Sequence, residues 1–128
     1  MTEWLTTADV LAIHDRQIAE HGGVEGIRDK NLLESALARP KQLLEYGRPQ
    51  PDIAALAAAY AFGIASNHAF GDGNKRTSAV VTELFLRLNG LSLTASDVDI
   101  VQTWSELGAG RLTESALAKW LRQNTVKL

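Results

Sequence analysis

Apolar side chains recur at intervals of three and four residues along most of the chain, which is the spacing of one face of a helix. No segment alternates apolar and polar residues long enough to predict a β-strand. The first helix is predicted to begin at Thr6 or Thr7, whose hydroxyl groups suit an N-cap. It is predicted to end at the glycine pair 22–23. The side chains expected on its buried face are Leu11, His14, Ile18 and His21.

The second and third helices are predicted on either side of a proline-rich loop. The second begins at an Asn31 cap and is stopped by Pro40, because proline lacks the N–H that an interior helical position donates. The segment 46–51 contains two prolines and is predicted to be a loop. Asp52 then caps a third helix that extends to about Asn67. Its many alanines permit close approach by neighbouring helices, so we expect this helix at the centre of the bundle.

Three further helices are predicted in the second half of the chain, and glycines mark their ends. Their expected ranges are 74–89, from 96 or 97 to 107, and from a Thr113 cap to about 123. The loop before the first of them, residues 68–73, contains two glycines and does not favour a helix. The predicted fold is all-α, a compact single-domain bundle of about six helices that spans residues 1–128.

The composition is that of an ordinary globular protein. The 128 residues are 45% apolar and 22% charged, which excludes a disordered or fibrous chain. There are 13 Lys and Arg against 15 Asp and Glu with no long basic run, which argues against direct nucleic-acid binding. No apolar stretch reaches about 18 residues, so no membrane span is predicted. With no cysteine and no apolar leader followed by a cleavage site, the expected location is the cytoplasm.

The candidate chemistry is concentrated in residues 68–76, between the third and fourth helices. The first backbone N–H groups of a helix have no intrahelical partner, and the helix dipole there favours an anion. Lys75 and Arg76 are expected in this first turn, where cations are unfavourable for the helix alone, so the pattern predicts a bound anion. Asp72 is a hard oxygen ligand that suits Mg²⁺ beside a phosphate. His68 can accept a proton near neutral pH.

Each feature of this segment also has an ordinary structural explanation. A lone histidine at a helix end is usually a capping or packing residue, and the sequence 72–74 is an ordinary turn followed by an Asn cap. A Lys–Arg pair is usually solvated. The spacing is also not that of a P-loop, because Asn74 separates Gly73 from Lys75. The order and compactness of the features are what favour the chemical interpretation.

Polar residues elsewhere are interpreted as structural. His14 and His21 are seven residues apart, and the resulting separation of about 10.5 Å along a helix axis is poor for binding one metal ion. Glu25, Arg28 and Asp29 follow the first helix in a glycine-rich segment and are interpreted as capping residues and solvated charges.

The segment 68–77 resembles the signature loop of the Fic/Doc family, specifically its death-on-curing branch. The residues that carry the resemblance are His68, Phe70, Asp72, Gly73, Asn74, Lys75, Arg76 and Thr77. Segments 21–29, 33–40 and 84–90 are similar to the flanking regions of the same proteins. The resemblance therefore covers nearly the whole chain.

The resemblance implies a role for each residue of the loop. His68 would be the general base that deprotonates a hydroxyl group on a target protein, and Phe70 would be a buried anchor that fixes the loop. Asp72 would hold Mg²⁺. The residues that would bind the phosphates of ATP are Gly73, Asn74, Lys75 and Arg76, through backbone donors, a side-chain donor on Asn74 and two positive charges.

Lys75 indicates which branch of the family the chain resembles. Adenylylating members have glycine at this position, whereas death-on-curing toxins have lysine. The resemblance implies a kinase that uses ATP and Mg²⁺ to transfer the γ-phosphoryl group to a threonine or serine of a translation factor, elongation factor Tu by resemblance. It also implies the toxin of a toxin–antitoxin pair that inhibits translation, with an antitoxin protein encoded nearby.

Two other functions stay open. Gly73 resembles adenylylating members, because the best-known death-on-curing toxin has alanine there, so AMP transfer to a protein hydroxyl is the first alternative. A non-catalytic binding module is the second. Ala79 stands where many members have an arginine that pairs with an inhibitory glutamate, so control by a separate antitoxin is favoured over autoinhibition.

Overall fold

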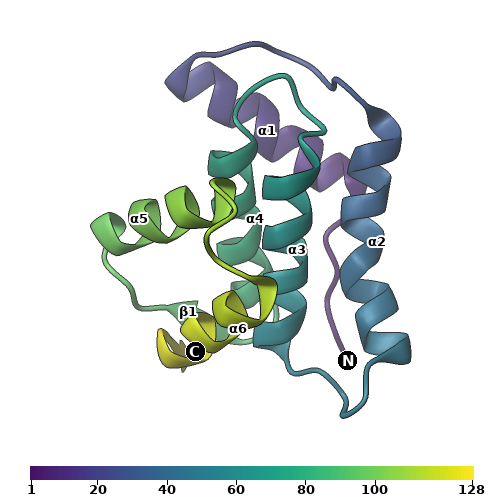
Figure 1. Cartoon of the computed structure of the whole chain (residues 1–128), viewed down its shortest axis with the longest axis vertical. Coiled ribbons are helices and arrows are strands. Elements are labelled where there is room, and N and C mark those ends of the chain that lie inside the picture. The colour runs from purple at the N-terminus through teal and green to yellow at the C-terminus, as the bar shows by residue number, and fades with distance from the viewer.

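The computed structural model describes residues 1–128 as six helices and two short strands (Figure 1). The elements in chain order are α1 (Thr7–His21), α2 (Lys30–Tyr46), α3 (Ile53–Asn67), α4 (Asn74–Leu88), β1 (Leu91–Leu93), α5 (Asp97–Gly108), α6 (Glu114–Gln123) and β2 (Thr125–Lys127). The predicted all-α fold is confirmed. None of the six helices is both long and apolar enough to cross a bilayer.

The helix α3 lies at the centre of the bundle, as its alanines predict. It contacts α2, α4, α5 and α6, and most of its side chains are buried. In Figure 1, α2 lies on one side of α3, and α5 and α6 lie on the other. The two helices α2 and α3 approach closely at Gly63, where an added Cβ atom would stand 3.1 Å from the Cα of Ala36. Small residues therefore let the two helices pack at short range.

The second helix corrects two details of the prediction. It is capped by Asp29 rather than Asn31, because the Asp29 carboxylate accepts hydrogen bonds from the N–H groups of Asn31 and Leu32 at 2.9 and 3.2 Å. It also continues through Pro40 to Tyr46. An interior proline costs roughly 3 kcal/mol, and burial of the apolar side chains on both sides of it against α3 offsets that cost. Those side chains are Leu33, Leu37, Leu43 and Leu44.

The buried face of α1 also differs from the prediction. The buried residues are Val10, His14, Gln17 and Ile18. Leu11 is only half-buried, and the His21 side chain in the last turn is exposed. The helix packs against α4 and crosses the end of the bundle where the α3–α4 loop lies (Figure 1), so its last turn has no neighbouring helix to cover it.

The two strands are the part of the fold that the apolar pattern does not predict. β1 and β2 pair antiparallel, with Ser92 opposite Val126, and tie the C-terminal segment to the chain that leaves α4. Each strand has three residues, and a segment that short carries no readable alternation.

One apolar core joins all six helices and includes the aromatic side chains of Tyr60, Phe85 and Trp104. Burial raises the pKa of the Tyr60 hydroxyl, which accepts a hydrogen bond from the N–H of Leu5 at 3.2 Å. The indole N–H of Trp104 in α5 donates to Ser78 in α4 at 2.9 Å. The Ser78 hydroxyl in turn donates to the Ala61 carbonyl of α3 at 2.8 Å. This chain of buried hydrogen bonds fixes α5 against the two central helices.

Candidate functional site

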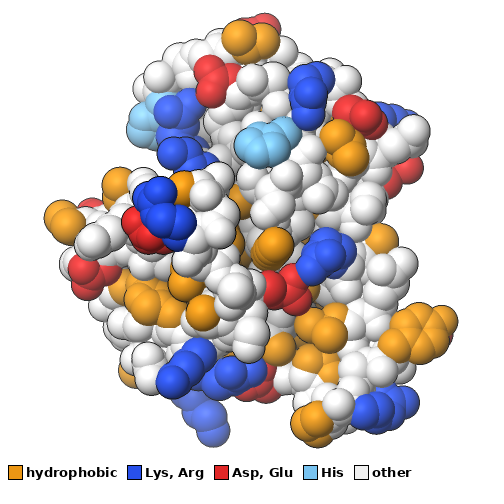
Figure 2. Space-filling model, in the orientation of Figure 1, with side chains coloured by type: hydrophobic (Ala, Val, Ile, Leu, Met, Phe, Trp, Pro, Cys, Tyr) orange, Lys and Arg blue, Asp and Glu red, His pale blue; other side chains and the backbone are white.

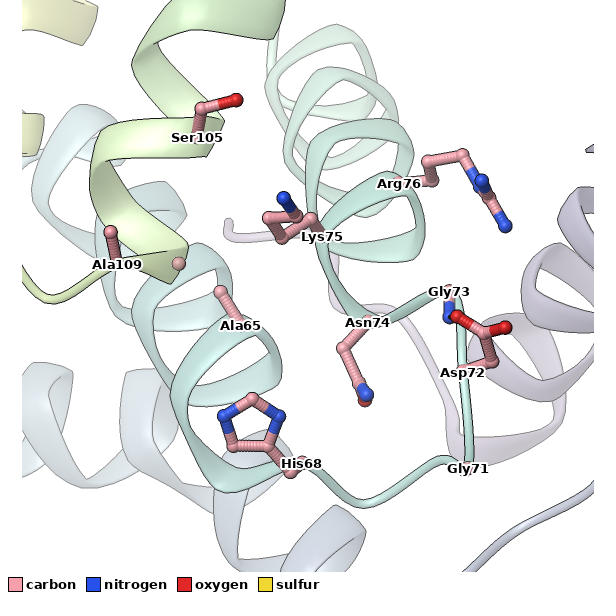
Figure 3. Close-up of a pocket in the computed structure, with 11 residues that line it drawn as sticks. Ala65, His68, Gly71, Asp72, Gly73, Asn74, Lys75, Arg76, Ser105 and Ala109 are labelled. Atoms are coloured by element: carbon pink, nitrogen blue, oxygen red, sulfur yellow. The ribbon is translucent and has the colours of Figure 1, made fainter. Parts of the chain in front are cut away.

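The α3–α4 loop and the C-terminal turn of α5 enclose a cavity of about 440 Å³ (Figure 3). Its lining residues are Ala65, His68, Gly71, Asp72, Gly73, Asn74, Lys75, Arg76, Ser105, Gly108 and Ala109. Every site residue proposed from the sequence lines this cavity, except the loop anchor Phe70. The side of the cavity that α5 contributes could not be predicted, because nothing near Ser105 in the sequence resembles a functional motif.

The N-terminus of α4 is open toward this cavity. Each of the other five helices has a side chain that caps its N-terminus, whereas α4 has none. Gly73 occupies the N-cap position with a φ of +75°, a conformation that glycine adopts without strain. The first helical hydrogen bond of α4 runs from the N–H of Thr77 to the Gly73 carbonyl at 3.0 Å. The N–H groups of residues 74–76 donate to no acceptor within the protein.

Asn74 closes the loop through its side chain. Its Oδ1 accepts from the N–H of Phe70 at 3.2 Å, and its Nδ2 donates to the Phe70 carbonyl at 3.1 Å. One of the two Nδ2 hydrogens is therefore used within the loop. The second Nδ2 hydrogen and the backbone N–H of Asn74 have no acceptor within the protein.

Phe70 is buried, as expected for the loop anchor, with 1% of its surface exposed. Its ring stacks on the imidazole of His14 from α1, with centroids 3.7 Å apart and planes 7° from parallel. The Nε2 of His14 is 2.8 Å from the backbone carbonyl oxygen of Asp72. His14 is thus structural, as interpreted from the sequence, and it holds both sides of the loop.

His68 ends α3 in the left-handed conformation, with φ +53° and ψ +46°. It is the only non-glycine residue of the chain with a positive φ, a conformation that costs roughly 1–2 kcal/mol. The Arg28 guanidinium donates to the His68 carbonyl at 3.0 and 2.7 Å, which stabilises this backbone geometry. The exposed imidazole faces the cavity (Figure 3). Arg28, interpreted from the sequence as a solvated charge, instead positions the candidate base.

Lys75 and Arg76 leave the first turn of α4 in different directions (Figure 3). Lys75 lies on the side of α5, where its methylene groups pass over Gly108. Arg76 points away from α5, and its Nη2 donates to the Gly22 carbonyl at 3.1 Å. The Nε of Arg76 is buried and has no acceptor within the protein. The two cations therefore border the open helix end from opposite sides.

Asp72 is exposed at the edge of the cavity, where its Oδ1 accepts from the N–H of Gly73 at 2.8 Å. Its Oδ2 receives no hydrogen bond. No group of three or more His, Asp or Glu side chains in the chain could enclose a metal ion. Mg²⁺ in nucleotide sites commonly uses one or two carboxylates together with phosphate oxygens and water. Asp72 therefore fits a cation that arrives with a nucleotide, and does not fit a cage made by the protein alone.

The charges on the molecular surface are mixed. On the face in Figure 2, basic side chains lie over several elements and are interspersed with acidic and apolar ones. The carboxylates and guanidinium groups also pair with one another, as in Arg111 with Glu106 and Arg122 with Asp52. In each pair the cation lowers the pKa of the carboxyl group.

Known proteins match this chain over most of its length. A family model described as Fic/DOC family matches residues 4–86. Toxin Doc of Mycolicibacterium smegmatis is 40% identical over 100 residues, which is 77% of this chain and 75% of that protein. Protein kinase doc of Escherichia phage P1 is 29% identical over 119 residues, which is 93% of each chain. The family match includes the whole α3–α4 loop and ends before α5.

Proposed function

Because the chain belongs to the Fic/DOC family, we propose that it is the toxin of a toxin–antitoxin pair and acts as a protein kinase. Its substrates are ATP and a threonine or serine hydroxyl of a translation factor, elongation factor Tu by resemblance. The two relatives are named Toxin Doc and Protein kinase doc, which supports both halves of the proposal. Phosphorylation of that factor would inhibit translation.

The observation that carries the proposal is the open N-terminus of α4 beside Lys75. Three free backbone N–H groups and the positive end of the helix dipole favour an anion at this point. Lys75 and Arg76 add two cations to the same turn, where they disfavour the helix in the absence of an anion. The phosphate chain of ATP has the charge and the acceptor oxygens that this arrangement lacks.

In the proposed reaction, His68 removes the proton from the hydroxyl of the target as that oxygen attacks the γ-phosphorus. The new bond joins the hydroxyl oxygen to the γ-phosphorus. The bond between that phosphorus and the β–γ bridging oxygen breaks, and ADP leaves with the electron pair. The N–H groups of α4 and the Lys75 ammonium stabilise the charge that develops on the phosphate oxygens. The Arg28 contact keeps the His68 backbone in place during this transfer.

Asp72 would hold Mg²⁺ in this site, and the ion, when bound with the nucleotide, would neutralise charge on the β- and γ-phosphates. The free Oδ2 of Asp72 supports this assignment. Metal removal with a chelator is expected to abolish transfer without unfolding the protein, because no structural element depends on a metal in this fold.

The deciding experiment uses ATP labelled on either the α- or the γ-phosphate, incubated with the protein and a bacterial lysate. We expect transfer of the γ-label to a lysate protein and no transfer of the α-label. Lys75→Gly is expected to lose γ-transfer, because it removes the ammonium from the open helix end. Its helix-propensity penalty is only about 1 kcal/mol, so the variant should remain folded.

Adenylylation is the second candidate, and one observation favours it. Gly73, which is shared by resemblance with the adenylylating members, occupies the N-cap of α4 with a φ of +75°, a conformation that glycine adopts without strain. Transfer of the α-label without the γ-label by the unmodified protein would replace the kinase assignment with this one. Transfer of neither label by a folded, growth-arresting protein would favour a binding module that uses no nucleotide chemistry.

We also propose that residues 1–128 act as one domain in the cytoplasm and that an antitoxin protein, encoded nearby, inhibits it. The shared core of all six helices supports the first point, and the name of the relative Toxin Doc supports the second. The antitoxin is expected to contribute a segment that folds as a helix on this bundle. Release of activity by a deletion within this chain, in the absence of any antitoxin, would contradict this mode of control.

A further inference from the structure

The Lys75 side chain passes so close to Gly108 that a Cβ atom at position 108 would collide with it. A Cβ atom added to Gly108 would stand 2.6 Å from the Cδ of Lys75 and 2.9 Å from its Cγ. Real Cβ atoms essentially never approach another heavy atom so closely. The missing side chain at position 108 is therefore the space in which the Lys75 methylene groups lie.

The backbone does not require a glycine at this position. Gly108 lies in the last turn of α5 and lacks the positive φ of Gly73 or Gly110. Alanine is more favourable than glycine in a helix by about 1 kcal/mol. Glycines often mark the ends of helices, and at this one the contact with Lys75 supplies a second physical reason for glycine.

Buried contacts hold the α5 wall, whereas the Lys75 side chain is exposed. Trp104 and Leu107 are buried on the same turns of α5, and Trp104 is bonded to Ser78 of α4. The Lys75 side chain, in contrast, is exposed and makes no hydrogen bond or ion pair in the structure. A side chain at position 108 would consequently displace Lys75 rather than α5.

We propose that Gly108 is a positioning residue, which seats the Lys75 side chain along α5 and so sets where its ammonium meets the phosphates of the nucleotide. The inference rests on the proposed function for the identity of the nucleotide, and on the contact alone for the position of Lys75. It extends the site beyond the family match, which ends at residue 86. It also means that the position of the Lys75 side chain in α4 depends on a residue of a different helix, α5.

The experiment is a double-mutant cycle of Gly108→Ala and Lys75→Ala, with ATP binding measured by calorimetry and γ-label transfer measured in parallel. In the presence of Lys75, Gly108→Ala is expected to weaken ATP binding roughly tenfold, the size of one lost hydrogen bond to a charged group. In the Lys75→Ala background the same change is expected to have no effect on binding. Val101→Ala is the matched control, because Val101 is exposed on the same helix and lies outside the cavity.

Folding provides a second check, because Gly108→Ala is expected to leave the thermal midpoint unchanged or raised while activity falls. A loss of stability that accounts for the loss of binding would overturn the inference. An equal effect of Gly108→Ala with and without Lys75 would overturn it as well, as would unchanged binding in the single variant.

A readout without nucleotide separates this inference from the proposed function. With ¹³Cε-labelled lysine, the Lys75 signal can be assigned by its absence in Lys75→Ala and is expected to shift in Gly108→Ala, whereas the other lysine signals stay in place. If the unmodified protein binds no ATP, the proposed function fails, and this shift alone decides the positioning role. An unchanged Lys75 signal in Gly108→Ala would refute it.

Discussion

The imidazole of His14 is bonded to the backbone of Asp72, 58 residues further along the chain, with Nε2 2.8 Å from the carbonyl oxygen. The ring is 1% exposed and stacks on Phe70. The helix α1 contributes no side chain to the cavity, but through this residue it holds the loop that carries the candidate metal ligand. The position of the open end of α4 therefore depends on a helix outside the site.

Replacement of His14 by phenylalanine is expected to keep the ring stack and lose the hydrogen bond. The part-buried hydrogen bond to the Asp72 carbonyl would be lost, and the net contribution of one such bond is about 0.5–1.5 kcal/mol of the free energy of unfolding. The measurement is urea denaturation, in which the midpoint should fall with an unchanged m-value. His21→Ala is the control, since that histidine is exposed, and it should not move the midpoint. A His14→Phe protein as stable as the unmodified one would show that the bond contributes nothing to the loop.

His68→Ala is expected to abolish growth arrest and to reduce γ-label transfer by a factor of about 10²–10⁴, the usual contribution of a general base. The variant removes the proton acceptor that faces the cavity. His68→Asn should give the same loss with less effect on stability, because asparagine tolerates the left-handed conformation that this position has. Both variants are checked for folding by circular dichroism. Full toxicity of a folded His68→Asn protein would remove His68 from the mechanism and favour a binding module.

Arg28→Gln is expected to lower kcat for transfer and to leave the KM for ATP nearly unchanged. The guanidinium bonds only the His68 carbonyl, so its loss frees the backbone of the proposed base without changing the proposed phosphate site. Arg16→Gln makes the same charge change at an exposed pair with Glu20 and serves as the control. A rise in KM with an unchanged kcat would contradict the positioning role, because that pattern indicates lost substrate binding.

The ion pair between Asp52 and Arg122 should make stability depend on acidic pH. Two hydrogen bonds from the guanidinium, at 2.6 and 3.0 Å, lower the pKa of the Asp52 carboxyl. Because the folded-state pKa lies below the unfolded value of about 4, the stabilisation is fully present above that value. It is lost as the pH falls through the lowered folded-state pKa. The side chain is half exposed, so the contribution should be below about 1 kcal/mol.

The measurement compares the unmodified protein with Asp52→Asn by urea denaturation at pH 7 and near pH 3. Asparagine can still cap α3 through the N–H of Ala55, so the variant isolates the charge. The stability difference is expected to be larger at pH 7 than near pH 3. An equal difference at both pH values would mean that the charge of Asp52 is not what stabilises the pair.

The sequence predicted most helix boundaries that depend on neighbouring residues, with the Asp29 cap of α2 as an exception. The side chains of Asp52, Ser96 and Thr113 each accept a bond from an N–H three residues ahead, and such local caps can be recognised from residue type and spacing alone. The candidate site was also predictable as a segment, because residues 68–76 are consecutive and their order matches a family signature. The open helix end and its two cations are likewise local features.

The tertiary structure decided what holds that segment in place. The helix α2 continues through Pro40 because its apolar side chains are buried against α3, although the local sequence predicts that it ends at this proline. The contacts of His14 with Asp72, of Arg28 with His68 and of Gly108 with Lys75 join residues far apart in sequence, and no local pattern records which of them will meet. The sequence by itself determined the helical fold and the chemical groups available in the loop. Only the packing of α1 and α5 around that loop determined which groups face the cavity and how they are held there, because that packing depends on apolar burial summed over the whole chain.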